Sequence, residues 1–242
     1  MRLHRVHVGQ PLKPESDILL AGGIAHYLRR VIRLEAGQSI VLFNGDGSDY
    51  LAEIIKPGKH EVLAQVLRRV EARPESPLRV TLVQALSRGE RMDQTLQKGT
   101  ELGVAAFRPV ISERVEIRIR PDKLAKRMEH WRKVVISACE QCGRAVIPAV
   151  SEPVNLDQFL AEASSTPRMM LEPGSKTALA QLRLEHQVEL LVGPEGGFSS
   201  GEIVLAREHG VLPISLGPRI LRTETAGAAA CAVLQALAGD FR

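Results

Sequence analysis

The chain has 242 residues, enough for one large domain or two small ones with a real hydrophobic core. Apolar residues make up 44 % of it and charged residues 25 %, which is ordinary for a folded globular protein and excludes an intrinsically disordered chain. No apolar run approaches the roughly 18 residues of a membrane-spanning helix, and residues 1–10 lack the apolar centre of a signal peptide. Three cysteines, an odd number, fit a reducing compartment, so we expect a cytoplasmic protein.

The first third reads as short strands separated by turns. Residues 2–8 alternate with period two, and residues 39–43 form an apolar run that ends at the turn Asn-Gly-Asp-Gly. Strands over residues 50–55 and 62–70 follow, and one short helix is expected near residues 26–34. The sequence therefore predicts a small β-barrel or sandwich over residues 1–72.

A change of pattern follows the proline-containing linker at residues 73–77. Strands and helices now alternate, which is typical of a parallel sheet covered on both faces. The predicted strands are residues 80–86, 105–111, 168–171, 188–192 and 211–215, and the predicted helices include residues 91–102 and a long basic helix that begins at Pro121. We therefore predict an α/β domain over residues 73–242.

The net charge of +4 is concentrated in one segment. Residues 113–144 hold nine lysines and arginines against five acidic residues. Such a stripe suits a phosphate backbone, although a solvated helix face gives the same pattern.

Two glycine-containing loops in the last quarter follow predicted strands, where parallel α/β sheets bind ligands. The first, residues 193–198, reads Gly-Pro-Glu-Gly-Gly-Phe and leads into an S-x-x-E capping box at Ser199. A tight connection without a ligand would explain this loop equally well. The second, residues 216–225, reads Leu-Gly-Pro-Arg-Ile-Leu-Arg-Thr-Glu-Thr and leads into a helix of small residues, against which something must pack closely. Its density of polar side chains favours a functional role.

Taken together, the two loops resemble the signature of the RsmE family, the ribosomal RNA uridine-N3 methyltransferases. Residues 98–104 (Lys-Gly-Thr-Glu-Leu-Gly-Val), residues 140–144 (Glu-Gln-Cys-Gly-Arg) and His26 followed by Val-Ile-Arg-Leu at residues 31–34 also match family motifs. The similarity runs from end to end, with a looser match at residues 5–8, where the family usually carries aromatic residues.

The resemblance implies an α/β fold in which a PUA-like RNA-binding barrel precedes a SPOUT domain with a C-terminal trefoil knot. It implies a homodimer that uses S-adenosylmethionine to methylate N3 of a uridine in 16S rRNA of the small ribosomal subunit, with U1498 as the family target. The expected cofactor-binding residues are Leu171, Gly193, Pro194, Glu195, Gly196, Gly197, Leu216, Gly217, Ile220, Leu221, Arg222, Thr223, Thr225 and Ala226.

Removing the N3 proton of uridine requires a base, and a nearby cation would stabilise the anion that forms. We expect Glu224 to be the base and Arg222 the cation, although Glu224 could instead cap the following helix. The candidate RNA contacts are Arg2, Arg5, His26, Arg30, Arg33, Arg88 and Arg144.

Other functions are less well supported by the sequence. Cys139 and Cys142 form a C-x-x-C pair with no second pair, so we expect a structural role and no metal. A Rossmann enzyme would place G-x-G-x-x-G after its first α/β strand, where this chain reads Ala-Leu-Ser-Arg-Gly-Glu at residues 85–90. A non-catalytic RNA-binding module with a scaffold α/β domain stays open as an alternative.

Overall fold

The computed structural model describes residues 3–117 and 119–241. The chain divides into two compact units. The N-terminal unit comprises Met1–Glu75 together with Cys139–Ile147, and the C-terminal unit comprises Ser76–Ala138 and Pro148–Arg242. Within the described residues, no helix is both long and apolar enough to cross a membrane.

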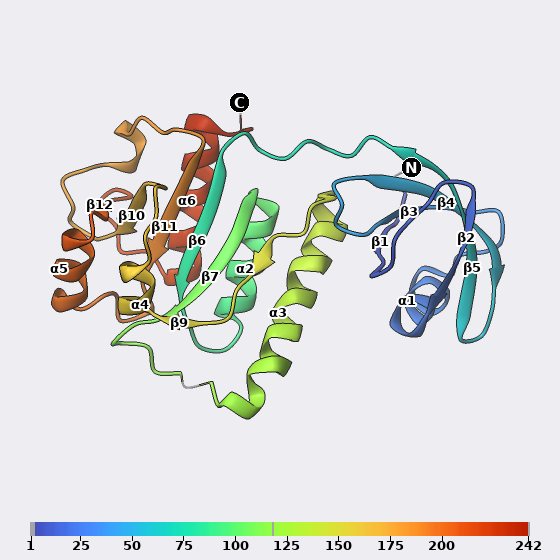
Figure 1. Ribbon diagram of the computed structural model, residues 1–242, viewed down its shortest axis with the longest axis horizontal. Coiled ribbons are helices and arrows are strands. Elements are labelled where there is room, and N and C mark those ends of the chain that lie inside the picture. Colours follow the sequence, from blue (N-terminus) through green and yellow to red (C-terminus); the bar gives the residue numbers. More distant parts are fainter. Residues whose placement is uncertain (1–2, 118, 242) are drawn as a thin grey trace. The chain divides into compact units, whose positions relative to one another are not determined.

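A single five-stranded sheet forms the N-terminal unit, in the order β1-β3-β4-β5-β2 (Figure 1). Only β1 and β3 pair in parallel, and in the described residues the edge strands β1 and β2 do not pair with each other. The strands are β1 (Arg5–His7), β2 (Ser16–Ala21), β3 (Ser39–Phe43), β4 (Asp49–Pro57) and β5 (Glu61–Val70). The sequence predicted four of them and missed β2.

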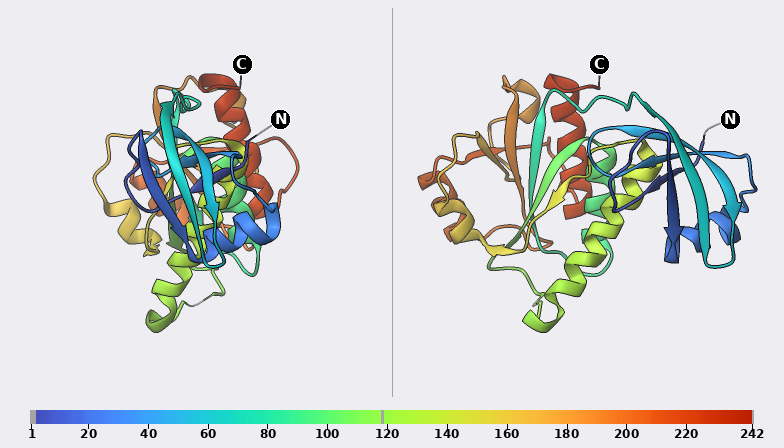
Figure 2. Two further views of the ribbon diagram at one scale, coloured as in Figure 1. Left: turned by 90° about the vertical axis from the view of Figure 1, so that its right-hand side faces the viewer. Right: turned by 45° about the vertical axis from the view of Figure 1, so that its right-hand side comes forward.

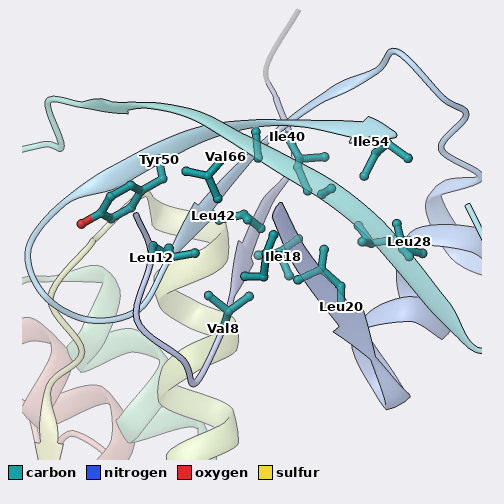
Figure 3. Packing of buried hydrophobic residues seen from close by; sticks show 14 of the residues in the cluster. Val8, Leu12, Ile18, Leu20, Leu28, Ile40, Leu42, Tyr50, Ile54 and Val66 are labelled. Atoms are coloured by element: carbon teal, nitrogen blue, oxygen red, sulfur yellow. The ribbon is translucent and has the colours of Figure 1, made fainter. Parts of the chain in front are cut away.

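The hydrophobic core of the N-terminal unit is formed by the side chains that alternate strand residues direct to one face of the sheet. Alternate residues of β2, β3 and β5 are buried, as expected for strands with one face on a core. Figure 3 shows Ile18, Leu20 and Leu42 gathered in this core. The predicted turn after β3 forms, with Gly45 and Gly47 at positive φ.

The predicted helix at residues 26–34 differs in the structure. A short helix α1 (Gly22–His26) continues as a π-helical turn η1 (Tyr27–Ile32). Arg33 ends it in the left-handed conformation, and the Leu34 amide donates to the Leu28 carbonyl oxygen at 3.0 Å. The wider turn buries Leu28 while Ile24 and Ile32 pack against the same core.

The N-terminal unit is completed by residues distant in sequence, namely Cys139–Ile147. The His7 amide donates to Oε1 of Glu140 at 3.0 Å. Arg5 pairs with Asp49 and donates to the Arg144 carbonyl oxygen at 2.9 Å, while Arg144 pairs with Glu75. These buried and half-buried polar contacts fix the segment to β1.

A seven-stranded sheet forms the C-terminal unit, in the order β12-β10-β11-β6-β7-β8, with β9 also paired to β7 (Figure 1). All pairings are parallel, which confirms the predicted sheet. The strands are β6 (Arg79–Ala85), β7 (Val104–Ile111), β8 (Ala149–Val150), β9 (Val154–Asn155), β10 (Arg168–Leu171), β11 (Gln187–Val192) and β12 (Leu212–Ile214). The helices are α2 (Arg91–Glu101), α3 (Pro121–Cys142, whose last turn lies in the N-terminal unit), α4 (Leu156–Ala161), α5 (Ser200–Glu208), α6 (Thr223–Ala238) and the 3-10 turn η2 (Leu179–Gln181).

Helices cover both faces of this sheet. Val83 and Ala85 of β6 belong to an apolar cluster with residues of α4 and α5. The alternate residues Leu82 and Gln84 face α6, which lies beside β6 (Figure 2). A Cβ at Gly227 of α6 would lie only 3.5 Å from Oε1 of Gln84. The small residues of α6 therefore permit close packing on the sheet, as the sequence predicted.

Candidate active site

A pocket of about 610 Å³ lies where β10, β11 and β12 end. This is the edge at which parallel α/β sheets bind ligands, and the volume is in the range of small-molecule sites. The described residues that line it are Arg91, Arg114, Leu171, Glu172, Pro173, Val192, Gly193, Pro194, Glu195, Gly196, Gly197, Phe198, Ile203, Ile214, Ser215, Leu216, Gly217, Arg219, Ile220, Leu221, Arg222, Thr223, Glu224 and Ala226.

The pocket brings together nearly all residues that the sequence assigned to a cofactor. Of that set only Thr225 does not line it, because this side chain is exposed on the first turn of α6. Both predicted catalytic residues, Arg222 and Glu224, line the pocket as well.

The loop at residues 193–198, which we call the glycine loop, is shaped by its glycines. Gly197 has a φ of +66°, and its amide donates to the Pro194 carbonyl oxygen at 2.9 Å. A Cβ at Gly193 would lie 3.3 Å from the Gly197 backbone, and a Cβ at Gly196 would lie 3.3 Å from the side chain of Arg114. Side chains at these positions would therefore crowd the pocket wall.

Two hydrogen bonds meet at Thr223, the first residue of α6, which directly follows the second loop, residues 216–222. The Thr223 hydroxyl donates to the Gly193 carbonyl oxygen at 2.6 Å. The same hydroxyl accepts from Nε2 of Gln84, a fully buried side chain of β6, at 2.9 Å. The two loops are thus fixed to each other and to the centre of the sheet.

Helix α5 follows the glycine loop and begins with the predicted capping box. The Ser199 hydroxyl accepts from the Glu202 amide at 3.2 Å, and the Glu202 carboxylate accepts from the Ser199 amide at 2.8 Å. Glu202 also accepts from the Glu113 amide at 2.7 Å, which ties the segment after β7 to this helix. The capping box therefore fixes where the glycine loop ends.

Glu195 of the glycine loop is held by residues near the start of α2. Its Oε1 accepts from the Arg88 amide at 3.0 Å and from Nη1 of Arg91 at 2.6 Å. Burial opposes ionisation of Glu195, but the hydrogen bonds from its own amide, Arg88 and Arg91 outweigh burial and lower the pKa of this carboxyl. The side chain is therefore an anion at neutral pH.

Glu224 stands in the first turn of α6, with its side chain only 16 % exposed. Its Oε2 is buried and accepts no hydrogen bond from the residues that the structure describes. Nε of Arg91 lies 3.9 Å from this oxygen, beyond hydrogen-bond distance. The N-cap residue Arg222 makes no capping hydrogen bond with its side chain within the described chain. A carboxylate in the first turn also interacts favourably with the helix dipole, so the roles of base and of helix cap both stay open for Glu224 at this point.

The sequence missed several pocket residues. Arg91 and Arg114 come from α2 and from the segment after β7, and neither lies in a recognisable motif. Nη1 of Arg114 donates to the Gly196 carbonyl oxygen at 2.8 Å, so this side chain lies directly on the glycine loop. Glu172 and Pro173 directly follow β10, and the rule that ligands bind at strand ends could have identified them.

The candidate RNA contacts have different surroundings. Arg2 lies outside the described residues. His26, Arg30 and Arg33 are exposed on α1, η1 and the residue after η1, and Arg88 is exposed and pairs with Glu116.

Arg5 and Arg144 differ from this set because both guanidinium groups are committed within the N-terminal unit. The Arg5 side chain is 8 % exposed and pairs with Asp49, and Arg144 pairs with Glu75. Breaking such pairs would leave a buried charge uncompensated. The structure therefore shows structural contacts of these two arginines that the sequence did not predict, and their part in RNA binding stays a prediction.

The C-x-x-C pair lies at the end of α3. Burial raises the pKa of the Cys139 thiol to about 12, so the group stays protonated, and it lies 3.7 Å from the Val146 carbonyl oxygen. Within the described part of the chain, no three histidine, cysteine, aspartate or glutamate side chains are grouped as a metal site.

Comparison with known proteins identifies both parts of the chain. Residues 74–235 match the RNA methyltransferase domain family, and residues 20–67 match the RNA methyltransferase PUA domain family. The ribosomal RNA small subunit methyltransferase E of Buchnera aphidicola from Schizaphis graminum is 33 % identical, over 99 % of this chain and 98 % of that protein. The protein of the same name from Synechocystis is 35 % identical, over 92 % of this chain and 74 % of its own length.

Two solved structures are similar over their whole length. The ribosomal RNA small subunit methyltransferase E of Neisseria gonorrhoeae, bound to S-adenosyl methionine, is 38 % identical with a TM-score of 0.95, and both chains are fully covered. A Legionella pneumophila protein in complex with the cofactor SAM is 43 % identical with the same TM-score and coverage. The fold is thus α/β with an N-terminal PUA-like domain, and the chain belongs to the ribosomal RNA small subunit methyltransferase E family.

Proposed function

We propose that this protein uses S-adenosylmethionine to methylate N3 of a uridine in 16S rRNA of the small ribosomal subunit, at the position U1498 on which the family acts. The observation that carries the proposal is the site itself. Two loops, joined through Thr223, enclose a pocket of about 610 Å³. The pocket contains the largely buried Glu224 carboxylate, whose Oε2 accepts no hydrogen bond from the described residues.

The residues of the pocket fit S-adenosylmethionine. Gly193 and Gly196 leave room that a Cβ would fill, and glycine-loop and second-loop backbone near Gly196, Leu216 and Leu221 can bind the adenosine. Apolar side chains of Leu171 and Ile220 supply walls for the base. When bound, the cofactor supplies an electrophilic methyl group on a positively charged sulfur and leaves as a neutral thioether.

The protein's own groups then handle the proton and the charge of the uridine. Glu224 Oε2 accepts the proton of N3, and the nitrogen electron pair forms the new bond to the methyl carbon. Arg222 stabilises the negative charge that develops on the uracil. The two linked loops hold both side chains in a fixed pocket, so that positioning contributes to the rate.

The wider assembly is part of the same proposal. The PUA-like domain over residues 1–72 holds RNA, and the SPOUT domain over residues 73–242 carries a C-terminal trefoil knot. The protein acts as a homodimer, as the resemblance to the family implies. The substrate is RNA of the small ribosomal subunit, so the protein acts in the cytoplasm.

Calorimetric titration with S-adenosylhomocysteine tests the cofactor and its loop. We expect saturable binding by the wild type and loss of binding in Gly196→Val, because the new side chain would meet Arg114. Gly9→Val is the matched control, since a Cβ at this glycine would have no atom within 4 Å and its φ is not in the left-handed region. A folded wild type that does not bind S-adenosylhomocysteine would instead support the non-catalytic RNA-binding module.

Transfer of a tritiated methyl group tests the substrate. Small subunits that lack the modification should accept the label, and mass spectrometry of the digested RNA should place it on N3 of one uridine. Naked 16S rRNA, assayed in parallel, shows whether the assembled subunit is required. Label on another atom or another nucleotide would contradict the proposed target.

A further inference from the structure

Arg91 occupies an unusual position between two carboxylates of the pocket. Nη1 hydrogen-bonds to Glu195 Oε1 at 2.6 Å, whereas Nε lies 3.9 Å from Glu224 Oε2. Glu195 is itself fixed by the Arg88 amide. The guanidinium of Arg91 therefore hydrogen-bonds to Glu195 but lies beyond hydrogen-bond distance of Glu224 Oε2.

This arrangement has a consequence for Glu224. Its Oε2 is buried yet accepts no hydrogen bond from the described residues, although a strong donor lies within 4 Å. A direct bond to Arg91 would occupy the oxygen and make the carboxylate a weaker base, because a paired cation favours the ionised form. At 3.9 Å the guanidinium makes no direct hydrogen bond to this oxygen, which leaves the oxygen able to take up a proton.

We propose that Arg91 is a positioning residue for Glu224 and that Glu195 sets the distance of Arg91, so that Glu224 Oε2 has no direct hydrogen bond to Arg91 until the substrate arrives. The inference rests on the proposed function, because it assigns Glu224 the role of base. The other charged side chains that line the pocket are Arg114, Glu172, Arg219 and Arg222.

The inference makes opposite predictions for two variants. In Glu195→Gln the guanidinium loses its charged partner and moves onto Glu224. In a plot of rate against pH, the rise of the rate on the acidic side (the acidic limb) should then shift to lower pH. The maximal rate should fall about tenfold because the base is weaker. In Arg91→Ala the cation is lost, so the limb should shift to higher pH.

Single-turnover methyl transfer to small subunits, measured from about pH 5 to about pH 9, provides the test. The double variant Glu195→Gln, Arg91→Ala should behave like Arg91→Ala alone if Glu195 acts through Arg91. Arg91→Gln serves as a second variant if the alanine protein does not fold. Glu162→Gln is the matched control, since it also breaks a carboxylate–arginine pair, with Arg108, but lies outside the pocket.

The outcomes separate the inference from the proposed function. A wild type without methyl transfer would overturn the function, and the inference with it. An active wild type whose profile has no acidic limb, or whose two variants shift in the same direction or not at all, would overturn the inference alone. Opposite shifts that merge in the double variant would establish it, because a merely structural role would lower all rates without moving the limb.

Discussion

Thr223 shows how much of the site depends on one hydroxyl group. It accepts a hydrogen bond from the buried Gln84 amide and donates one to the Gly193 carbonyl oxygen. One small side chain thus fixes the glycine loop, the start of α6 and the middle of the sheet at a single point. These hydrogen bonds join residues far apart in sequence, so the amino-acid pattern gave no sign of them.

Thr223→Val should therefore destabilise the protein, although its shape is almost unchanged. Leaving buried polar groups unpaired costs about 1–3 kcal/mol, and the loosened glycine loop should bind S-adenosylhomocysteine more weakly. Urea denaturation and calorimetry measure the two effects. Thr95→Val is the control, because the buried Thr95 hydroxyl has no partner in the described structure and its loss should cost little. Equal destabilisation by both variants would contradict the assigned role.

Glu224→Gln tests the proposed base directly. The amide has the same size but cannot accept the proton, so turnover should fall by about 10²-fold or more while S-adenosylhomocysteine binding stays the same. Methyl transfer and calorimetry on the same preparation separate the two. Unchanged turnover would show that Glu224 is not the base.

Single residues also mark the limit of sequence interpretation. The two glycine-containing loops were found because glycine and proline after an apolar strand are a local signal, and all but one of their predicted cofactor residues line the pocket. Arg91 opens an ordinary amphipathic helix, and Arg114 follows β7 without a motif. Both contribute only because the fold brings them to the glycine loop.

At the level of elements, the best predictions were those with strong periodicity or clear ends. Strands β6, β7, β10 and β11 are rich in apolar residues, and Pro121 starts α3 as expected. Strand β2 was missed because Leu19 is apolar yet half exposed, which blurs the alternation. Helix α4 has only six residues, too few for a helical period, and its Asn155 capping box becomes clear only in the structure.

The last turn of α3 carries a pH-sensitive contact with β1. Burial raises the pKa of Glu140, against the opposing effects of the His7 amide and Arg5. The pKa of Glu140 is 4.5 in the unfolded chain and higher in the native protein. At a pH between these two pKa values, Glu140 holds a proton in the native protein that it has lost in the unfolded chain. Stability from this group is therefore present below that window and is lost as pH rises through it.

Glu140→Gln should accordingly raise stability at about pH 7, because the amide oxygen can still accept from His7 without a buried charge. The gain should vanish below pH 4.5, and thermal unfolding across a pH series that spans this value measures it. Glu129→Gln is the control, since Lys133 lowers the pKa of this exposed carboxyl and no gain is expected. A variant less stable than the wild type at neutral pH would contradict the assignment.

At the scale of the whole molecule, scarce aromatic residues leave charge as the main means of holding RNA. The exposed cations of α3 include Lys123, Lys126 and Arg127. Affinity for small subunits should fall steeply as the salt concentration rises. The double variant Lys126→Gln, Arg127→Gln should reduce the slope of log affinity against log salt concentration, by about 0.7–0.9 for each phosphate that is no longer neutralised. Filter binding at several salt concentrations measures the slope. Lys176→Gln, a change outside α3, should leave it unchanged, and a flat response in the wild type would contradict the prediction.

The return of Cys139–Ile147 to the N-terminal unit has a consequence for biosynthesis. One hydrogen bond of Arg5 and the ion pair of Glu75 both require Arg144, so the first 75 residues emerge from the ribosome without these two contacts, although Arg5 can already pair with Asp49. We therefore expect the unit that begins the chain to complete its folding only after residue 147 has been translated. For the same reason it cannot be exchanged between proteins as a continuous cassette, and a useful transplant would have to include the end of α3.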